Sequence, residues 1–278
     1  MNLFCLLRKM KLLRVKPSFF CLLSLLFFSA FVFSQQTEIV DFISVKAVVR
    51  PLLKEKKIIA NASYTFKILK KCDSVYLDAK GIFLLKKIKN HKIAVILKNK
   101  KIWFVSNFKP NQTYTVSFQY ETSPKKALYF LDQQIWTQGQ GKYTSNWLPS
   151  IDDMNDKIEF DISYIIPSDK TIVANGKLVA VTDNGNVKKW SFNMEHPMSS
   201  YLVSFAVGDF SKKTIVSSSN IHMELYYPTS DSLLIEPTYR YSKRIFDFLE
   251  NEIGVDYPWQ NYKQVPLKDF LYAGMENT

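Results

Sequence analysis

Residues 62–69, ASYTFKIL, and residues 113–120, TYTVSFQY, determine the fold class of this 278-residue chain. Both segments are short and rich in β-branched and aromatic residues, and apolar side chains alternate with polar ones along them. Alternation with a period of two is typical of a strand that buries one face. The two segments therefore predict strands of a sheet with one side turned to a hydrophobic core.

The same strand pattern continues from Thr37 to about Tyr227. Further segments of this kind are VKAVV, SVYLDAKGIFLL, KIAVIL, KIWFV, FDISYIIP, KLVAVT, VKKWSF, YLVSFAVGDF and HMELYYP. Residues 183–186, Asp-Asn-Gly-Asn, separate KLVAVT from VKKWSF and predict a hairpin turn, because Asn and Gly tolerate positive φ. Strands at this regular spacing predict a large antiparallel sheet or sandwich.

A helical pattern follows Pro228. Four apolar residues fall on one helix face: Tyr241, Ile245, Phe248 and Leu249. We expect Ser232 to cap the start of this helix, Pro237 to lie in its first turn and Gly254 to end it. The change from strand to helix pattern predicts a domain boundary near residue 229.

The first 34 residues resemble no part of a folded domain. Residues 1–18 carry five basic residues and no acidic one, and residues 19–33 form an apolar run. A basic region before a short apolar run is typical of a secretory signal peptide, so we predict residues 1–34 as a signal cleaved after Ser34. The chain starts at Met1 or Met10, and an uncleaved anchor is the alternative, although a span needs about 20 apolar residues. We expect an exported protein, periplasmic, cell-surface or extracellular, that meets a membrane only through this segment.

The charge balance is basic. The formal net charge is +12, and removing the five basic residues of the first 34 leaves +7 (12 − 5). The basic runs are spread between apolar stretches and accompany no recognised nucleic-acid-binding module, so no nucleic-acid partner is predicted. Cys72 is the one cysteine outside residues 1–34, which excludes an intrachain disulfide there and predicts a buried apolar role.

Residues 273–277, Ala-Gly-Met-Glu-Asn, are the most informative short stretch. They resemble the Gly-Ala-Met-Glu-Asn exopeptidase motif of the aminopeptidase N (M1) family, with the first two residues exchanged. The residues before them, 252–272, are similar to the family's approach to that motif. Residues 136–167 and 199–210 resemble two further family segments, so the resemblance covers most of residues 136–278, whereas residues 37–135 are only compatible in their β pattern.

The resemblance implies a fold that is mainly β. An antiparallel, saddle-like β domain would occupy residues 35–228, and residues 229–278 would be the truncated start, helix and strand, of a thermolysin-like α/β catalytic domain. The implied protein is a secreted zinc aminopeptidase that hydrolyses N-terminal residues from peptides with a free N-terminus. This chain would be its N-terminal part.

The resemblance also implies roles for the motif residues. Glu276 would bind the α-ammonium of the substrate, since two unit charges ~4 Å apart attract by roughly 4 kcal/mol at an effective dielectric near 20, before desolvation. The backbone of Ala273 and Gly274 would run beside the substrate, together with Met275. Asn277 would orient the loop through hydrogen bonds.

Two glutamines upstream complete the predicted substrate-binding set. By resemblance, Gln140 would accept a hydrogen bond from the α-ammonium through its amide oxygen, and Gln138 would line the pocket for the first side chain. Asp152 and Asp153 follow Trp-Leu-Pro and resemble the structural Asp of the family, and we interpret them as a turn or salt-bridge feature. Met154 and Asn155 stand where the family commonly has a proline.

The zinc implied by the resemblance has no recognisable ligands in this sequence. Zinc peptidases of this class use His-Glu-x-x-His on a helix, in which both imidazoles share one face and the Glu is a general base. His91, His196 and His222 lie outside any such pattern, so they are predicted to be surface or packing residues and the chain alone to be inactive. Two alternatives remain: a non-catalytic exported peptide- or carbohydrate-binding β protein, and an inactive homologue that binds peptide termini.

Overall fold

The computed structural model describes residues 36–87 and 92–277. This part of the chain is mainly β with antiparallel sheets, which confirms the predicted fold class. The predicted signal peptide, residues 1–34, and His91 lie outside the described residues. No helix among the described residues is long and apolar enough to cross a membrane.

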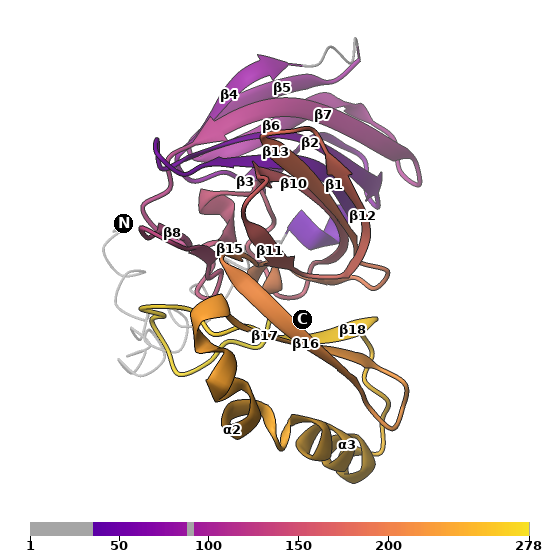
Figure 1. Ribbon diagram of the computed structural model, residues 1–278. Helices are drawn as coiled ribbons and strands as arrows, with labels where there is room; N and C mark the ends of the chain where they lie inside the picture. Colours follow the sequence, from indigo (N-terminus) through magenta and orange to yellow (C-terminus); the bar gives the residue numbers. More distant parts are fainter. Residues whose placement is uncertain (1–35, 88–91, 278) are drawn as a thin grey trace, which may run out of the picture. The chain divides into compact units, whose positions relative to one another are not determined.

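The largest sheet has eight strands in the order β12-β13-β10-β1-β2-β7-β4, with β14 added beside β10 (Figure 1). Its strands are β1 (Val40–Leu52), β2 (Lys57–Ile68), β4 (Ile82–Lys87), β7 (Thr113–Thr122), β10 (Lys157–Pro167), β12 (Lys177–Asp183), β13 (Val187–Asn193) and β14 (Met198–Ser199). The segments ASYTFKIL and TYTVSFQY are neighbours here, with Tyr64 opposite Val116. The sheet is antiparallel except where β1 runs parallel to β10.

Three smaller sheets accompany the large one. The first has the order β3-β6-β5, with strands β3 (Cys72–Asp78), β5 (Ala94–Lys98) and β6 (Lys101–Phe108). The second has the order β11-β15-β9-β8, with β8 (Leu128–Phe130), β9 (Ile135–Thr137), β11 (Thr171–Ala174) and β15 (Phe205–Gly208). The third joins β16 (Phe210–Val216), β17 (His222–Pro228) and β18 (Asn261–Gln264), with β17 and β18 parallel. Short 3-10 turns lie at Gln36–Glu38 (η2), Thr144–Asn146 (η3) and Ser200–Leu202 (η4).

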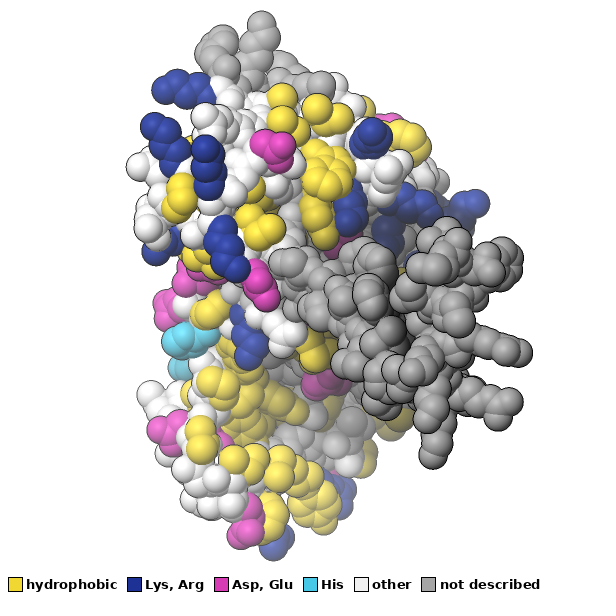
Figure 2. All heavy atoms as spheres, turned by 180° about the vertical axis from the view of Figure 1, so that it is seen from behind, with side chains coloured by type: hydrophobic (Ala, Val, Ile, Leu, Met, Phe, Trp, Pro, Cys, Tyr) yellow, Lys and Arg dark blue, Asp and Glu magenta, His cyan; other side chains and the backbone are white. Residues whose placement is uncertain are grey.

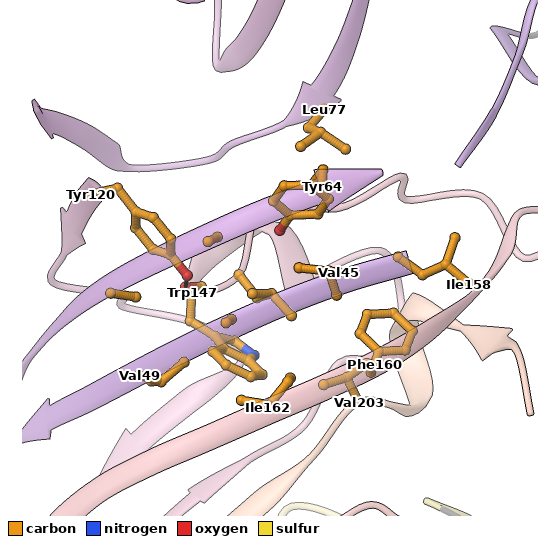
Figure 3. Close-up of a cluster of buried hydrophobic side chains, with 14 of the residues drawn as sticks. Val45, Val49, Tyr64, Leu77, Tyr120, Trp147, Ile158, Phe160, Ile162 and Val203 are labelled. Atoms are coloured by element: carbon orange, nitrogen blue, oxygen red, sulfur yellow. Dashed lines mark hydrogen bonds between the residues drawn. The ribbon is translucent and has the colours of Figure 1, made fainter. Parts of the chain in front are cut away.

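Alternation along the strands builds one main hydrophobic core. In β2 every second side chain is buried, and Tyr64 and Phe66 are completely inaccessible to solvent. Figure 3 shows valines of β1 and Ile162 of β10 around Trp147 in this core. The hairpin predicted at residues 183–186 is confirmed, since β12 pairs with β13 and Gly185 has a φ of +80°. Cys72 packs against this core but is only partly buried, so its predicted buried apolar role is confirmed in part.

The predicted C-terminal helix is interrupted. Residues Thr229–Leu234 (η5) form 3-10 turns, followed by α2 (Ile235–Tyr239) and α3 (Ser242–Ile253). Ser232 lies inside η5, so its prediction as the helix cap is wrong; Pro237 does fall in the first turn of α2. Gly254 ends α3 in the left-handed conformation, with its N–H donating to the carbonyl of Glu250, as predicted.

The apolar face of α3 is open to solvent. The four residues that define the face in the sequence are each about half exposed: Tyr241, Ile245, Phe248 and Leu249. Phe246 is buried instead, because its ring lies against Tyr257 and Tyr262. Figure 2 shows apolar side chains gathered over the lower part of the molecule, where the C-terminal elements lie. The periodicity identified the helix but not the face that the described residues bury.

The boundary predicted near residue 229 remains a prediction. The parallel pairing of β17 with β18 carries one sheet across it, because Leu225 lies opposite Gln264. The strands of residues 210–228, β16 and β17, therefore share a sheet with β18 of the C-terminal segment and not with the strands that precede them in the sequence.

Candidate functional site

The loop that follows β9, the glutamine loop, carries both predicted glutamines. Gln138 is buried and Gln140 is exposed, with Gly139 between them. A Cβ atom on Gly139 would lie 2.3 Å from the hydroxyl oxygen of Thr144 and 2.6 Å from the carbonyl oxygen of Tyr201. Only glycine therefore lets the backbone approach its neighbours so closely at this point.

We expect Gly139→Ala to destabilise the protein by about 2 kcal/mol, because the new methyl group overlaps a backbone carbonyl that cannot easily move. Urea unfolding followed by circular dichroism measures the change. Gly274→Ala is the matched control, since a Cβ atom there meets nothing within 4 Å. Equal costs for the two variants would contradict this account of Gly139.

Side-chain hydroxyl groups fix the segment that follows the loop. Tyr120 of β7 donates a hydrogen bond to the carbonyl of Trp147 at 3.0 Å, and Tyr64 of β2 donates to the carbonyl of Pro149. Figure 3 shows the Tyr120 hydroxyl directed at the backbone of Trp147. Ser200 donates to the carbonyl of Ile151 at 2.7 Å. The core of the large sheet thus holds this irregular segment through its backbone.

Asp152 and Lys80 form a partly buried ion pair beside the loop. The ammonium of Lys80 lies 2.8 Å from the Asp152 carboxylate, whose side chain is 6% exposed, and it also donates to the carbonyl of Lys142. Asp153 accepts hydrogen bonds from the backbone and side-chain amides of Asn155. The salt-bridge and turn roles predicted for Asp152 and Asp153 are confirmed. The ion pair ties the glutamine loop to the strand ends beneath it.

The motif segment, residues 273–277, is irregular and forms no strand. Asn277 donates to the carbonyl of Leu202 at 2.9 Å, as expected for a residue that orients this loop. The amide of Gln138 is 4.0 Å from the sulfur of Met275, which joins the motif to the glutamine loop. The exchanged order of Ala273 and Gly274 has no steric consequence here, because the position of Gly274 is open.

One cavity of about 310 Å³ brings the two predicted anchors together. Gln140 and Glu276 both line it, although 136 positions separate them in the sequence. Four of the other predicted residues line a neighbouring cavity of about 630 Å³ instead: Ala273, Gly274, Met275 and Asn277. Gln138 lines neither cavity and is 2% exposed, so the structure does not place it in a side-chain pocket.

Several residues of the smaller cavity were not expected from the sequence. They are Gly141, Lys142, Met154, Ser200 and Tyr201. Asp152 and Asp153, for which the sequence predicted only a structural role, also line this cavity. The segment from residue 199 to 210 was interpreted as one strand, which is wrong, because η4 turns the chain between β14 and β15. That turn directs the Tyr201 carbonyl at Gly139. Two serines before an aromatic residue were the available signal for a turn here.

A second carboxylate near the site is strongly perturbed. Asp156 is 8% exposed, and its pKa is raised to about 7, with burial as the largest cause. The neighbouring charges of Asp41 and Asp153 contribute to this rise, whereas a hydrogen bond from the backbone of Phe42 opposes it. A carboxyl group in these surroundings holds its proton near neutral pH.

No metal centre is formed by the residues that the structure describes. Residues 36–87 and 92–277 contain no group of three or more His, Cys, Asp or Glu side chains that could hold a metal ion. His222 is exposed on β17, and the His196 ring packs 6.3 Å from that of Trp259, so these two histidines have the surface and packing roles predicted. The described residues do not fit a zinc ion.

The β sheets, the glutamine loop and the motif segment form one mainly β unit with a cavity lined by Gln140 and Glu276. The model of the peptidase M1 N-terminal domain family matches residues 44–202, more than half of the chain. This protein therefore belongs to the M1 peptidase family.

Curated relatives agree with this family assignment. The glutamyl aminopeptidase of Rattus norvegicus is 29% identical over 130 residues, which is 46% of this chain and 14% of the relative. Aminopeptidase 2 of Candida albicans is 30% identical over 132 residues, with the same two shares. The puromycin-sensitive aminopeptidase of Caenorhabditis elegans is 25% identical over 143 residues, covering 51% of this chain and 15% of that protein. The matches thus span about a seventh of the relatives' length.

Proposed function

We propose that this chain is the N-terminal part of an aminopeptidase and that it recognises the free α-ammonium group of a peptide. The observation that carries the proposal is the shared cavity of Gln140 and Glu276. Glu276 is exposed, so its carboxylate is available to an incoming cation. The names of the curated relatives, all aminopeptidases, support the same class of substrate.

The chemistry of the cavity suits an ammonium ion held between a carboxylate and an amide. An α-ammonium group has three donors, and Glu276 and Gln140 supply acceptor oxygens. Asp152 is already paired with Lys80, so it contributes little net negative charge. Asp153 lines the same cavity and adds to the attraction for cations. An acetylated N-terminus would lose the charge and the donors on which this recognition depends.

Binding of tri-alanine and of N-acetyl-tri-alanine to the purified chain tests the proposal. Nuclear magnetic resonance titration should show tighter binding of the free peptide, by about tenfold, and Glu276→Gln should abolish this preference because an amide carries no charge. Glu252→Gln, at an exposed position of α3, is the matched control and should leave the preference intact. Equal affinities of the unaltered chain for both peptides would refute amine recognition.

The complete enzyme would hydrolyse N-terminal residues from peptides, and zinc would supply its Lewis-acid chemistry. The described residues offer zinc no ligand set, so we assign no hydrolytic step to them. Export through the segment predicted as a signal, residues 1–34, is a further part of the proposal. Mass spectrometry of the secreted product tests it, since cleavage after Ser34 leaves a new N-terminus at Gln35.

The family match weighs against the alternative of an unrelated carbohydrate-binding module. Such a module would have no reason to share the M1 N-terminal domain over residues 44–202. An inactive relative that binds peptide termini would use the same cavity, and hydrolysis of alanine p-nitroanilide by the complete protein would distinguish it from an enzyme.

A further inference from the structure

The turn between β11 and β12 is held by a partly buried lysine from a distant strand. The Lys263 ammonium, on β18, donates to the carbonyl of Ala174 at 2.7 Å and to that of Gly176. Gly176 has a φ of +79°, and a Cβ atom there would lie 2.4 Å from the carbonyl oxygen of Asn193. The turn is therefore closely packed on one side and bound to an ammonium group on another.

Asn175, the middle residue of the same turn, is linked to the end of the motif segment through the carbonyl of Leu202. The side-chain oxygen of Asn175 accepts the backbone N–H of Ser204 at 2.6 Å, and its amide donates to the carbonyl of Leu202 at 3.2 Å. The same carbonyl accepts the hydrogen bond from Asn277. Residues 263 and 277 lie on either side of Glu276. Both are thus joined to the 174–176 turn, Lys263 directly and Asn277 through the carbonyl of Leu202.

The stretch between these two anchors has its own attachment. Trp136 of β9 donates to the carbonyl of Lys268 at 3.2 Å, and the side-chain oxygen of Gln134 accepts the Lys268 N–H at 2.9 Å. Val265, Leu267 and Phe270 pack against a second hydrophobic cluster around Trp136. Three separate contacts therefore fix the course of residues 263–277.

The ammonium of Lys263 is the one charged group among these contacts. Burial lowers its pKa to about 8, whereas the carboxylate of Glu224 on β17 acts in the opposite direction. At neutral pH the group is still mostly charged, and charge-assisted hydrogen bonds to carbonyl oxygens are stronger than neutral ones. The ammonium binds two carbonyl oxygens of one turn, so its removal leaves both of them without this donor.

We infer that Lys263 is a positioning residue: by binding the 174–176 turn, to which Asn277 is also joined through Leu202, it sets the place of Glu276 in the recognition cavity. The role in recognition rests on the proposed function. The attachment itself does not, so the two can fail separately.

Hydrogen–deuterium exchange and peptide titration on the full 278-residue chain test the inference together. Lys263→Met should speed the exchange of residues 265–277 by about tenfold and weaken the binding of tri-alanine to a similar degree, while exchange in β2 stays unchanged. Lys263→Arg, which keeps the charge and the donors, should restore most of both. Lys213→Met, at an exposed lysine of β16, is the matched control.

The outcomes separate the two ideas. Unchanged exchange of residues 265–277 in Lys263→Met would overturn the positioning role, as would a faster exchange spread equally over β2, which indicates general destabilisation. If the unaltered chain does not prefer tri-alanine over its acetylated form, the proposed recognition fails, yet selective exchange in Lys263→Met would still establish the attachment. Faster exchange with unaltered tri-alanine binding would overturn the link to Glu276.

Discussion

Replacing Trp147 by alanine should lower the free energy of unfolding by about 4 kcal/mol, the largest loss expected from any single change near the glutamine loop. The indole is completely buried, and its ring meets Phe205 edge-on at 5.2 Å between centroids. Removing it leaves a cavity under the segment that leads from Gln140 to Asp152. Urea unfolding followed by circular dichroism measures the loss.

Two further variants make the prediction on Trp147 specific. Trp103→Ala removes an indole that is partly exposed beside Tyr76, so its cost should be well under half as large. Trp147→Phe should recover most of the stability, because the indole N–H has no hydrogen-bond partner among the described residues. Equal costs for Trp147→Ala and Trp103→Ala would show that the segment is not supported from the core as described.

Stability should fall as the pH rises from about 4 to 7, because of Asp156. Its folded-state pKa of about 7 lies above the ordinary value of 3.8. Between these values the folded protein binds one more proton than the unfolded chain, so the stabilisation is complete below pH 4 and is lost as the pH passes 7. A shift of roughly 3 units corresponds to about 4 kcal/mol at most.

Asp156→Asn should remove this dependence. The amide cannot ionise but can still accept the hydrogen bond from the Phe42 backbone. The variant should therefore be more stable than the unaltered protein at pH 8 and nearly equal to it at pH 4, as measured by urea unfolding at both values. Asp132→Asn, at an exposed position, is the control and should leave the profile unchanged. A profile that Asp156→Asn leaves unaltered would assign the titration to another group.

The sequence predicted local features well because their causes are local. The 183–186 hairpin and the Gly254 helix end depend on residues that tolerate positive φ, and that property is readable from a few letters. The parallel pairing of β1 with β10 was not predictable in this way. More than a hundred residues separate Val45 from its partner Phe160, and both strands read simply as buried on one face.

The candidate site was predicted only in part. Glu276 and Gln140 came from a resemblance, and the structure places both in one cavity. The bonds that hold the site run from side chains to backbone carbonyls, as from Tyr64 to Pro149 and from Lys263 to Ala174. Every residue has a carbonyl, so such a partner leaves no mark in the sequence. Gln138 lines neither cavity, and its place beside the first substrate side chain remains a prediction.

The buried tyrosines of the large sheet also give the protein an optical property. Burial raises the pKa of the Tyr64, Tyr120 and Tyr164 phenols far above the ordinary value. In strong alkali these rings stay in the un-ionised form, which lacks the red-shifted ultraviolet band of tyrosinate, for as long as the sheet is closed. Exposed tyrosines ionise and develop that band at once. A slower second increase of the band's absorbance in a stopped-flow experiment would therefore measure the rate at which the sheet opens.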